Sequence, residues 1–171
     1  GDIGDNRTLR PYVTVYVIAE PGEAEAAPVL RTWHATYPEA PLDSESIAVH
    51  PLTGDIHIIT KTGEPRSPVW RLPPGMADGE TAELEFLGEL NTDAATDKRT
   101  TSADWDDDGE RLIIRTYHSV IEFEVDRCDP VIDWNAPTRV INDVGIGQGE
   151  AVGYDTAGDL IAGIINPYKR L

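Results

Sequence analysis

The chain has 171 residues, 40% of them hydrophobic, which suits one domain with a sizeable core. It carries 31 Asp and Glu against 14 Lys and Arg, a net charge of −17. Such a surface repels phosphate backbones and anionic lipid, so neither nucleic acid nor a membrane is an expected partner. No apolar run approaches the ~20 residues of a membrane-spanning helix, and the single cysteine, Cys128, excludes an internal disulfide.

The apolar segments are short, rich in Val, Ile and aromatic residues, and separated by Gly, Pro and Asp. Period-two alternation, which is typical of strands, occurs in Tyr12–Pro21, Ile56–Thr60, Leu84–Leu90, Arg111–Tyr117 and Val120–Val125. No window keeps helical spacing over the ~11 residues of an average helix. The sequence therefore predicts an all-β chain.

Three stretches repeat one pattern of a short strand, a polar turn containing Gly, and an apolar strand. They are Glu45–Lys61, Thr101–Tyr117 and Glu150–Asn166. The first two are each followed by an outer pair of strands, Val69–Pro73 with Ala82–Leu90 and Ser119–Val125 with Thr138–Val144. A period of about fifty residues with four strands is typical of β-propeller blades. We expect a β-propeller, or part of one, built of four-stranded antiparallel blades.

The repeat divides one propeller domain, 1–171, into four parts. We expect an outer half-blade at about 1–40, blades at about 41–92 and 93–145, and an inner half-blade at about 146–171. Propellers typically need four to eight blades to close. Either the ends of a longer chain were trimmed, or a second chain or a second copy completes the ring; two copies meeting head to tail would give six blades.

The acidic stretch DWDDDGE has the spacing of the first half of a calcium-binding loop, at Asp104, Asp106 and Asp108. The twelfth position of such a loop requires a bidentate Glu, and here it is Arg115. The stretch aligns with the first turn of the two other repeats, where Asp and Gly serve the backbone. We interpret it as a hairpin turn, with calcium binding as the alternative.

The repeat puts Glu45 and Glu150 at equivalent positions just before the innermost strands. Two carboxylates that converge on one axis attract a cation or raise each other's pKa. Lys61 and Arg115 close the second strands of successive blades, with Tyr117 beside Arg115. At the same channel mouth these side chains would bind a polar or anionic ligand. The alternatives are solvated glutamates and a structural ion pair of Lys61.

The N-terminal stretch GDIGDN places Asp2, Asp5 and Asn6 in a tight loop. Oxygen ligands at this spacing suit a hard cation such as Ca²⁺. The alternative is an Asx turn, in which the side chains accept backbone N–H groups. The four tryptophans recur about once per blade and are interpreted as packing between blades.

A family resemblance follows from five segments: GDIGDNRTLRPYVTVYVIAEP, YPEAPLDSESIAVHPLTGDIHIITK, VWRLPP, LIIRTY and GQGEAV. With them the chain resembles secreted bacterial β-propeller proteins, mostly uncharacterised and distantly similar to the phytase-related, esterase-like propellers. The resemblance covers nearly the whole chain and implies an extracellular or periplasmic location. In that group a further N-terminal segment normally precedes GDIGDN, so the chain resembles a fragment lacking one blade or more.

These observations lead to one expected function and two alternatives. We expect a propeller without assigned catalysis whose acidic channel mouth binds a cation, Ca²⁺ among them, or a small polar ligand. The first alternative is a calcium-assisted phosphoester or ester hydrolase, with calcium on Glu45, Glu150 and Asp5, and Lys61 and Arg115 on the substrate. The second is a protein-interaction scaffold with an exposed apolar patch.

Overall fold

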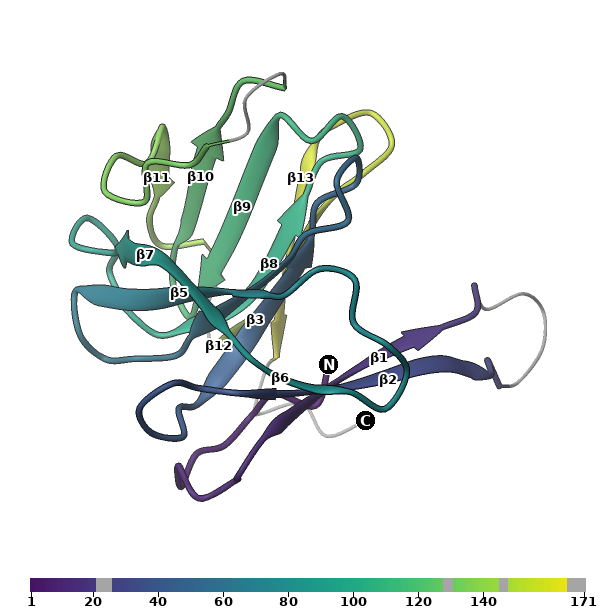
Figure 1. The fold of residues 1–171 in the computed structure, drawn as a ribbon. Coiled ribbons are helices and arrows are strands. Elements are labelled where there is room, and N and C mark those ends of the chain that lie inside the picture. Colours follow the sequence, from purple (N-terminus) through teal and green to yellow (C-terminus); the bar gives the residue numbers. More distant parts are fainter. Residues whose placement is uncertain (21–25, 128–130, 145–147, 166–171) are drawn as a thin grey trace.

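A computed structural model describes residues 1–20, 26–127, 131–144 and 148–165. They form thirteen strands and no helix, so the predicted all-β class is confirmed (Figure 1). Among them there is no helix with the length and apolarity needed to cross a membrane. Cys128 lies outside the described residues, as does half of the connection between the first two strands.

The strands form four sheets. The first is β1–β2–β6, with bounds Val13–Ile18, Val29–Thr36 and Thr81–Glu83. The second is β3–β4–β5–β7, with bounds Ser44–Val49, Ile56–Thr60, Arg66–Leu72 and Glu85–Asn91. The third is β8–β9–β10–β11, with bounds Thr100–Trp105, Arg111–Thr116, Val120–Glu124 and Arg139–Ile141. The last is β12–β13, with bounds Gln148–Tyr154 and Leu160–Ile165.

One strand differs from the expectation. The segment predicted as a single outer strand, Ala82–Leu90, is divided between two sheets. Its first part belongs to β6, which pairs in parallel with β2 of the first sheet, and its second part is β7, which pairs antiparallel with β5. The division falls at Leu84, which is buried and donates its N–H to the Thr36 carbonyl at 2.9 Å. Leu84 is buried in the core between the first and second sheets, and at this residue the chain leaves the ladder with β2 and enters the ladder with β5.

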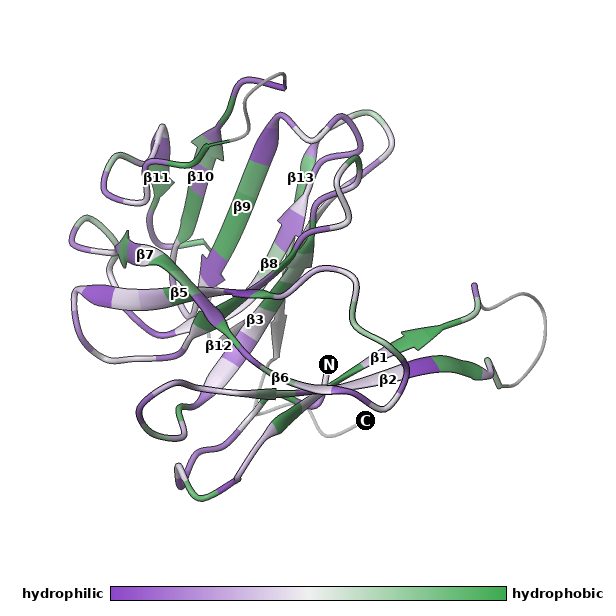
Figure 2. Ribbon diagram, viewed as in Figure 1, coloured by the Kyte–Doolittle hydropathy of each residue, from purple (hydrophilic) through white to green (hydrophobic). Residues whose placement is uncertain are grey.

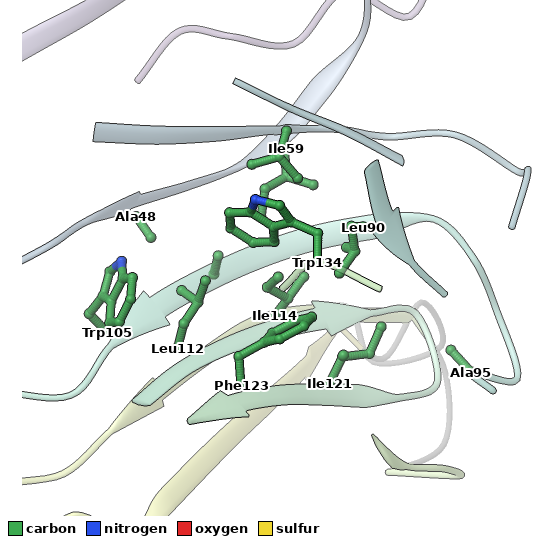
Figure 3. Close-up of a cluster of buried hydrophobic side chains, with 12 residues drawn as sticks. Ala48, Ile59, Leu90, Ala95, Trp105, Leu112, Ile114, Ile121, Phe123 and Trp134 are labelled. Atoms are coloured by element: carbon green, nitrogen blue, oxygen red, sulfur yellow. The ribbon is translucent and has the colours of Figure 1, made fainter. Parts of the chain in front are cut away.

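The central sheets are buried on both faces. Successive residues of a strand point to opposite faces, yet the neighbours Ile58 and Ile59 on β4 are both fully buried. Ile58 packs with Val13, Val15 and other residues of the first sheet. Ile59 belongs to the cluster toward the third sheet, which Figure 3 shows; its buried members include Leu90, Leu112, Ile114, Ile121, Phe123 and Trp134. The middle of β9 is accordingly hydrophobic in Figure 2.

The first turn of each repeat is built alike. Each contains a glycine with φ between 70° and 78°, at Gly54, Gly109 and Gly158. Each also begins with a side chain that accepts backbone N–H groups of the turn, at His50, Asp106 and Asp155. The stretch DWDDDGE thus forms the turn between β8 and β9, in which glycine supplies the left-handed backbone that other residues adopt at a cost.

His57 is a buried base between the second and third sheets. It lies on β4 with its ring centroid 5.9 Å from that of Trp105 and 6.1 Å from that of Trp134. Both tryptophans therefore pack between sheets, as predicted for the tryptophans. Burial lowers the pKa of His57 to about 4.

His57 should make the protein less stable as the pH falls. The unfolded chain takes up a proton on this side chain near pH 6.5, whereas the folded chain does so only near pH 4. Between these values we expect a loss of about 3 kcal/mol in the free energy of unfolding that is due to His57 alone. Urea unfolding at several pH values, compared between the wild type and His57→Phe, measures it. Equal pH slopes in the two proteins would contradict the assignment.

Candidate functional site

Lys61 joins side chains from two sheets. It follows β4, and its Nζ donates to Glu45 Oε2 at 2.7 Å and to the Tyr117 hydroxyl at 2.9 Å. Glu45 lies at the start of β3, and Tyr117 directly follows β9. Burial by itself would lower the pKa of Lys61, but these two hydrogen bonds outweigh it and raise the pKa above its ordinary value. Lys61 is therefore a charged ammonium held by both partners.

Glu150 comes to the same place from the last sheet. It lies near the start of β12 and is half-buried. Burial raises its pKa, the negative charge of Glu45 raises it further, and Lys61 opposes both. Within the described part of the chain, the Glu150 carboxylate has no hydrogen bond or ion pair. The structure thus brings together four predicted residues: Glu45, Lys61, Tyr117 and Glu150.

Arg115 lies behind this group rather than at its surface. Its side chain on β9 is fully buried, and Nη2 donates to the Val144 carbonyl at 2.6 Å. Nε and Nη1 have no hydrogen-bond partner among the residues that are described. The guanidinium passes so close to Gly149 that a Cβ there would collide with it. A fully buried Arg115 does not line an open surface, so its contact with a ligand stays a prediction.

Arg99 is a member of the group that the sequence did not indicate. Its guanidinium carbon lies 4.6 Å from the centroid of the Tyr117 ring, in the geometry of a cation–π contact. The same guanidinium pairs with Asp97. The repeat offered no signal for Arg99, because the residue precedes β8, outside the repeated stretch.

The N-terminal oxygens are occupied by neighbouring groups. Asp2 makes a bidentate pair with Arg10, at 2.7 and 2.8 Å, and this hydrogen bonding lowers the pKa of Asp2. Asp5 is buried and accepts the Arg10 backbone N–H at 2.7 Å. Asn6 is exposed in a turn. Asp5 thus accepts a backbone N–H group, as the Asx-turn alternative expects of these side chains. Ca²⁺ binding at Asp2, Asp5 and Asn6 stays a prediction.

The carboxylates of DWDDDGE have separate partners. Asp104 accepts the Tyr154 backbone N–H at 3.2 Å, and burial raises its pKa. Asp106 accepts Arg111 Nε at 2.9 Å. Asp108 is exposed, 3.8 Å from Arg127. No group of three His, Cys, Asp or Glu that could hold a metal occurs in the described ranges, so calcium at Asp104, Asp106 and Asp108 also stays a prediction.

Comparison with protein-family models and with curated proteins found no match for this chain. The resemblance to secreted propellers therefore stays a prediction.

Removing the Lys61 charge should change the titration of Glu150. In Lys61→Met, Glu150 loses the nearby positive charge that lowers its pKa, so we expect the pKa of Glu150 to rise above its wild-type value. Tyr117→Phe is the matched control, because it removes one hydrogen bond of Lys61 and leaves its charge. NMR titration of the side-chain carboxyl carbons measures both variants. An unchanged or lower Glu150 pKa in Lys61→Met would show that Lys61 does not face Glu150.

Proposed function

We propose that the four sheets are consecutive blades of a β-propeller, with β3, β8 and β12 as innermost strands. The strand order within the second and third sheets supports this, since each begins with the first strand of a repeat and continues outward in chain order. The contacts of β8 with both β3 and β12 also support it. Burial of the second sheet on both faces is what neighbouring blades require.

We infer that the protein binds a small polar ligand with a cationic or hydrogen-bond-donating group at the mouth formed by these innermost strands. The observation that carries the proposal is the convergence of Glu45, Lys61, Tyr117 and Glu150. In each antiparallel sheet, the start of the first strand lies beside the end of the second. This is the end at which β3 and β12 begin and at which β4 and β9 finish. The four side chains therefore share that end.

The charges of the group favour a cationic partner. Lys61 neutralises Glu45 and is held by two acceptors, whereas Glu150 keeps a carboxylate without a partner among the described residues. A carboxylate with a raised pKa gains most from a proton or from a positive group placed beside it. An ammonium donor or a hard cation would supply that charge, and Tyr117 with Arg99 would border it.

Calcium fits this arrangement less well than an ammonium group. Ca²⁺ takes six to eight oxygen ligands, but Glu45 Oε2 is already held by Lys61. Asp5, the third carboxylate expected of a hydrolase, already accepts the backbone N–H of Arg10. We therefore derive no hydrolytic step, and the calcium-assisted hydrolase, the interaction scaffold and the extracellular or periplasmic location stay predictions.

Calorimetric titration into metal-stripped protein tests the site. We expect ethanolammonium, a small polar cation, to bind the wild type and to bind Glu150→Gln at least about tenfold more weakly, since a hydrogen bond to a charged group is lost. Glu64→Gln, which alters an exposed carboxylate elsewhere, should bind like the wild type. Tight calcium binding that both Glu45→Gln and Glu150→Gln abolish would replace the ammonium site with a metal site. No binding of either probe would overturn the proposal.

A second copy of the chain is the proposed partner that completes the ring. β1 and β2 extend away from the other sheets in Figure 1, and the end of β1 and the start of β2 are hydrophobic in Figure 2. Its exposed apolar residues are Tyr16, Ile18, Val29 and Leu30. Apolar surface of this kind is typical of interaction sites. Native mass spectrometry should give twice the 18.7 kDa of one chain, and a compact monomer would contradict the dimer.

A further inference from the structure

A second candidate site lies beside the two outer strands of the second sheet, β5 and β7, and includes neither Lys61 nor Glu150 in its lining. A cavity of about 570 Å³ opens between β5, β7 and the connection from β2 to β3. Its lining includes three aromatic rings and two carboxylates: Tyr37, Trp70, Phe86, Glu39 and Glu89. The volume is in the range of small-molecule sites.

The three rings form the aromatic walls of the cavity, with Tyr37 and Phe86 each packed against Trp70. The centroid of Tyr37 lies 5.4 Å from that of Trp70 with an interplanar angle of 75°, and Phe86 lies 5.3 Å from Trp70 at 63°. Each neighbour thus stands edge-on to the indole. Trp70 is buried, whereas Phe86 is 56% exposed, so the rings extend from the core to the surface.

Hydrogen bonds at the polar ends fix two of the rings. Trp70 Nε1 donates to Thr60 Oγ1 at 2.9 Å, and the Tyr37 hydroxyl bonds to Ser44 Oγ at 2.8 Å. Burial raises the pKa of Tyr37 to about 12, so it stays an uncharged phenol at neutral pH. The aromatic walls are therefore set before any ligand arrives, which lowers the cost of binding.

A β-bulge brings a carboxylate to the same face as the rings. Trp70 pairs with Phe86 and Val69 with Gly88, so Leu87 is an extra residue in β7. In a regular strand, residues three apart point to opposite faces. The extra residue places Glu89 on the side of Phe86, and both line the cavity.

We propose that this cavity binds a small organic ammonium ion, with the aromatic rings around its alkyl groups and Glu39 and Glu89 near its charge. The negative face of an aromatic ring attracts a cation, and alkylammonium groups shed water readily enough to enter such a site. The two carboxylates add charge complementarity, and the net charge of −17 favours cations over anions at the surface.

The test uses choline and its uncharged isostere 3,3-dimethylbutan-1-ol, titrated at constant ionic strength. The indole Nε1–H signal of Trp70, assigned by its loss in Trp70→Phe, reports binding by NMR. We expect choline to shift this signal saturably and to bind about tenfold or more tightly than the isostere. Equal affinity for the two probes, or no saturable shift, would overturn the proposal.

Variants separate this cavity from other acidic surface. Phe86→Ala and Glu89→Gln should each weaken choline binding about three- to thirtyfold. Both residues are exposed, so neither substitution removes a buried core side chain. Glu83→Gln, an exposed carboxylate outside the cavity, is the matched control. Equal weakening in Glu83→Gln would overturn the proposal. So would loss of choline binding in Glu150→Gln, because it would assign choline to the channel-mouth group instead.

Discussion

Burial of both faces of a sheet is the constraint on which the rest of this structure depends. A strand such as β4, with Ile58 and Ile59 both fully buried, is stable only where another layer covers each side. The first sheet supplies one layer and the third sheet the other. Because both faces are covered, consecutive residues are buried in β4 and in β9. The packing of the sheets also determines which strand ends come together. β8 contacts both β3 and β12, so the starts of these three strands lie at the same end of their sheets.

The group around Lys61 follows from that stacking. None of its members is unusual in its own sheet, since each merely begins or ends a strand. They come together because three sheets lie side by side: the second sheet contributes Glu45 and Lys61, the third contributes Tyr117, and the last contributes Glu150. The charge of Glu45 raises the pKa of Glu150, and the Lys61 ammonium, which is bonded to Glu45, opposes that effect. The cavity beside Trp70 arises differently, from a local irregularity in one strand.

The sequence was informative where the repeat applies. Internal similarity placed Glu45 and Glu150 at one level and put Lys61 and Tyr117 at strand ends, and period-two patterns located β4, β9 and β10. It could not locate Arg99, which has no counterpart in the other repeats. Nor could it show that Arg115 is buried. The guanidinium occupies the space beside Gly149, a residue 34 positions away that meets Arg115 only in the folded chain. The bulge at Leu87 was equally hidden, since one extra residue leaves no mark on an apolar run.

The parallel pairing of β6 with β2 has a consequence for how the sheets could be separated. The segment that carries β6 belongs in chain order to the second sheet, yet its backbone hydrogen bonds are with the first. The two sheets therefore share a ladder rather than only a side-chain contact. A cut or a recombination point placed near residue 40, where the repeat suggests a unit ends, would leave that ladder without one of its strands. At this junction the repeats are not interchangeable modules, and their evolution by duplication or exchange would have to carry β2 and β6 together.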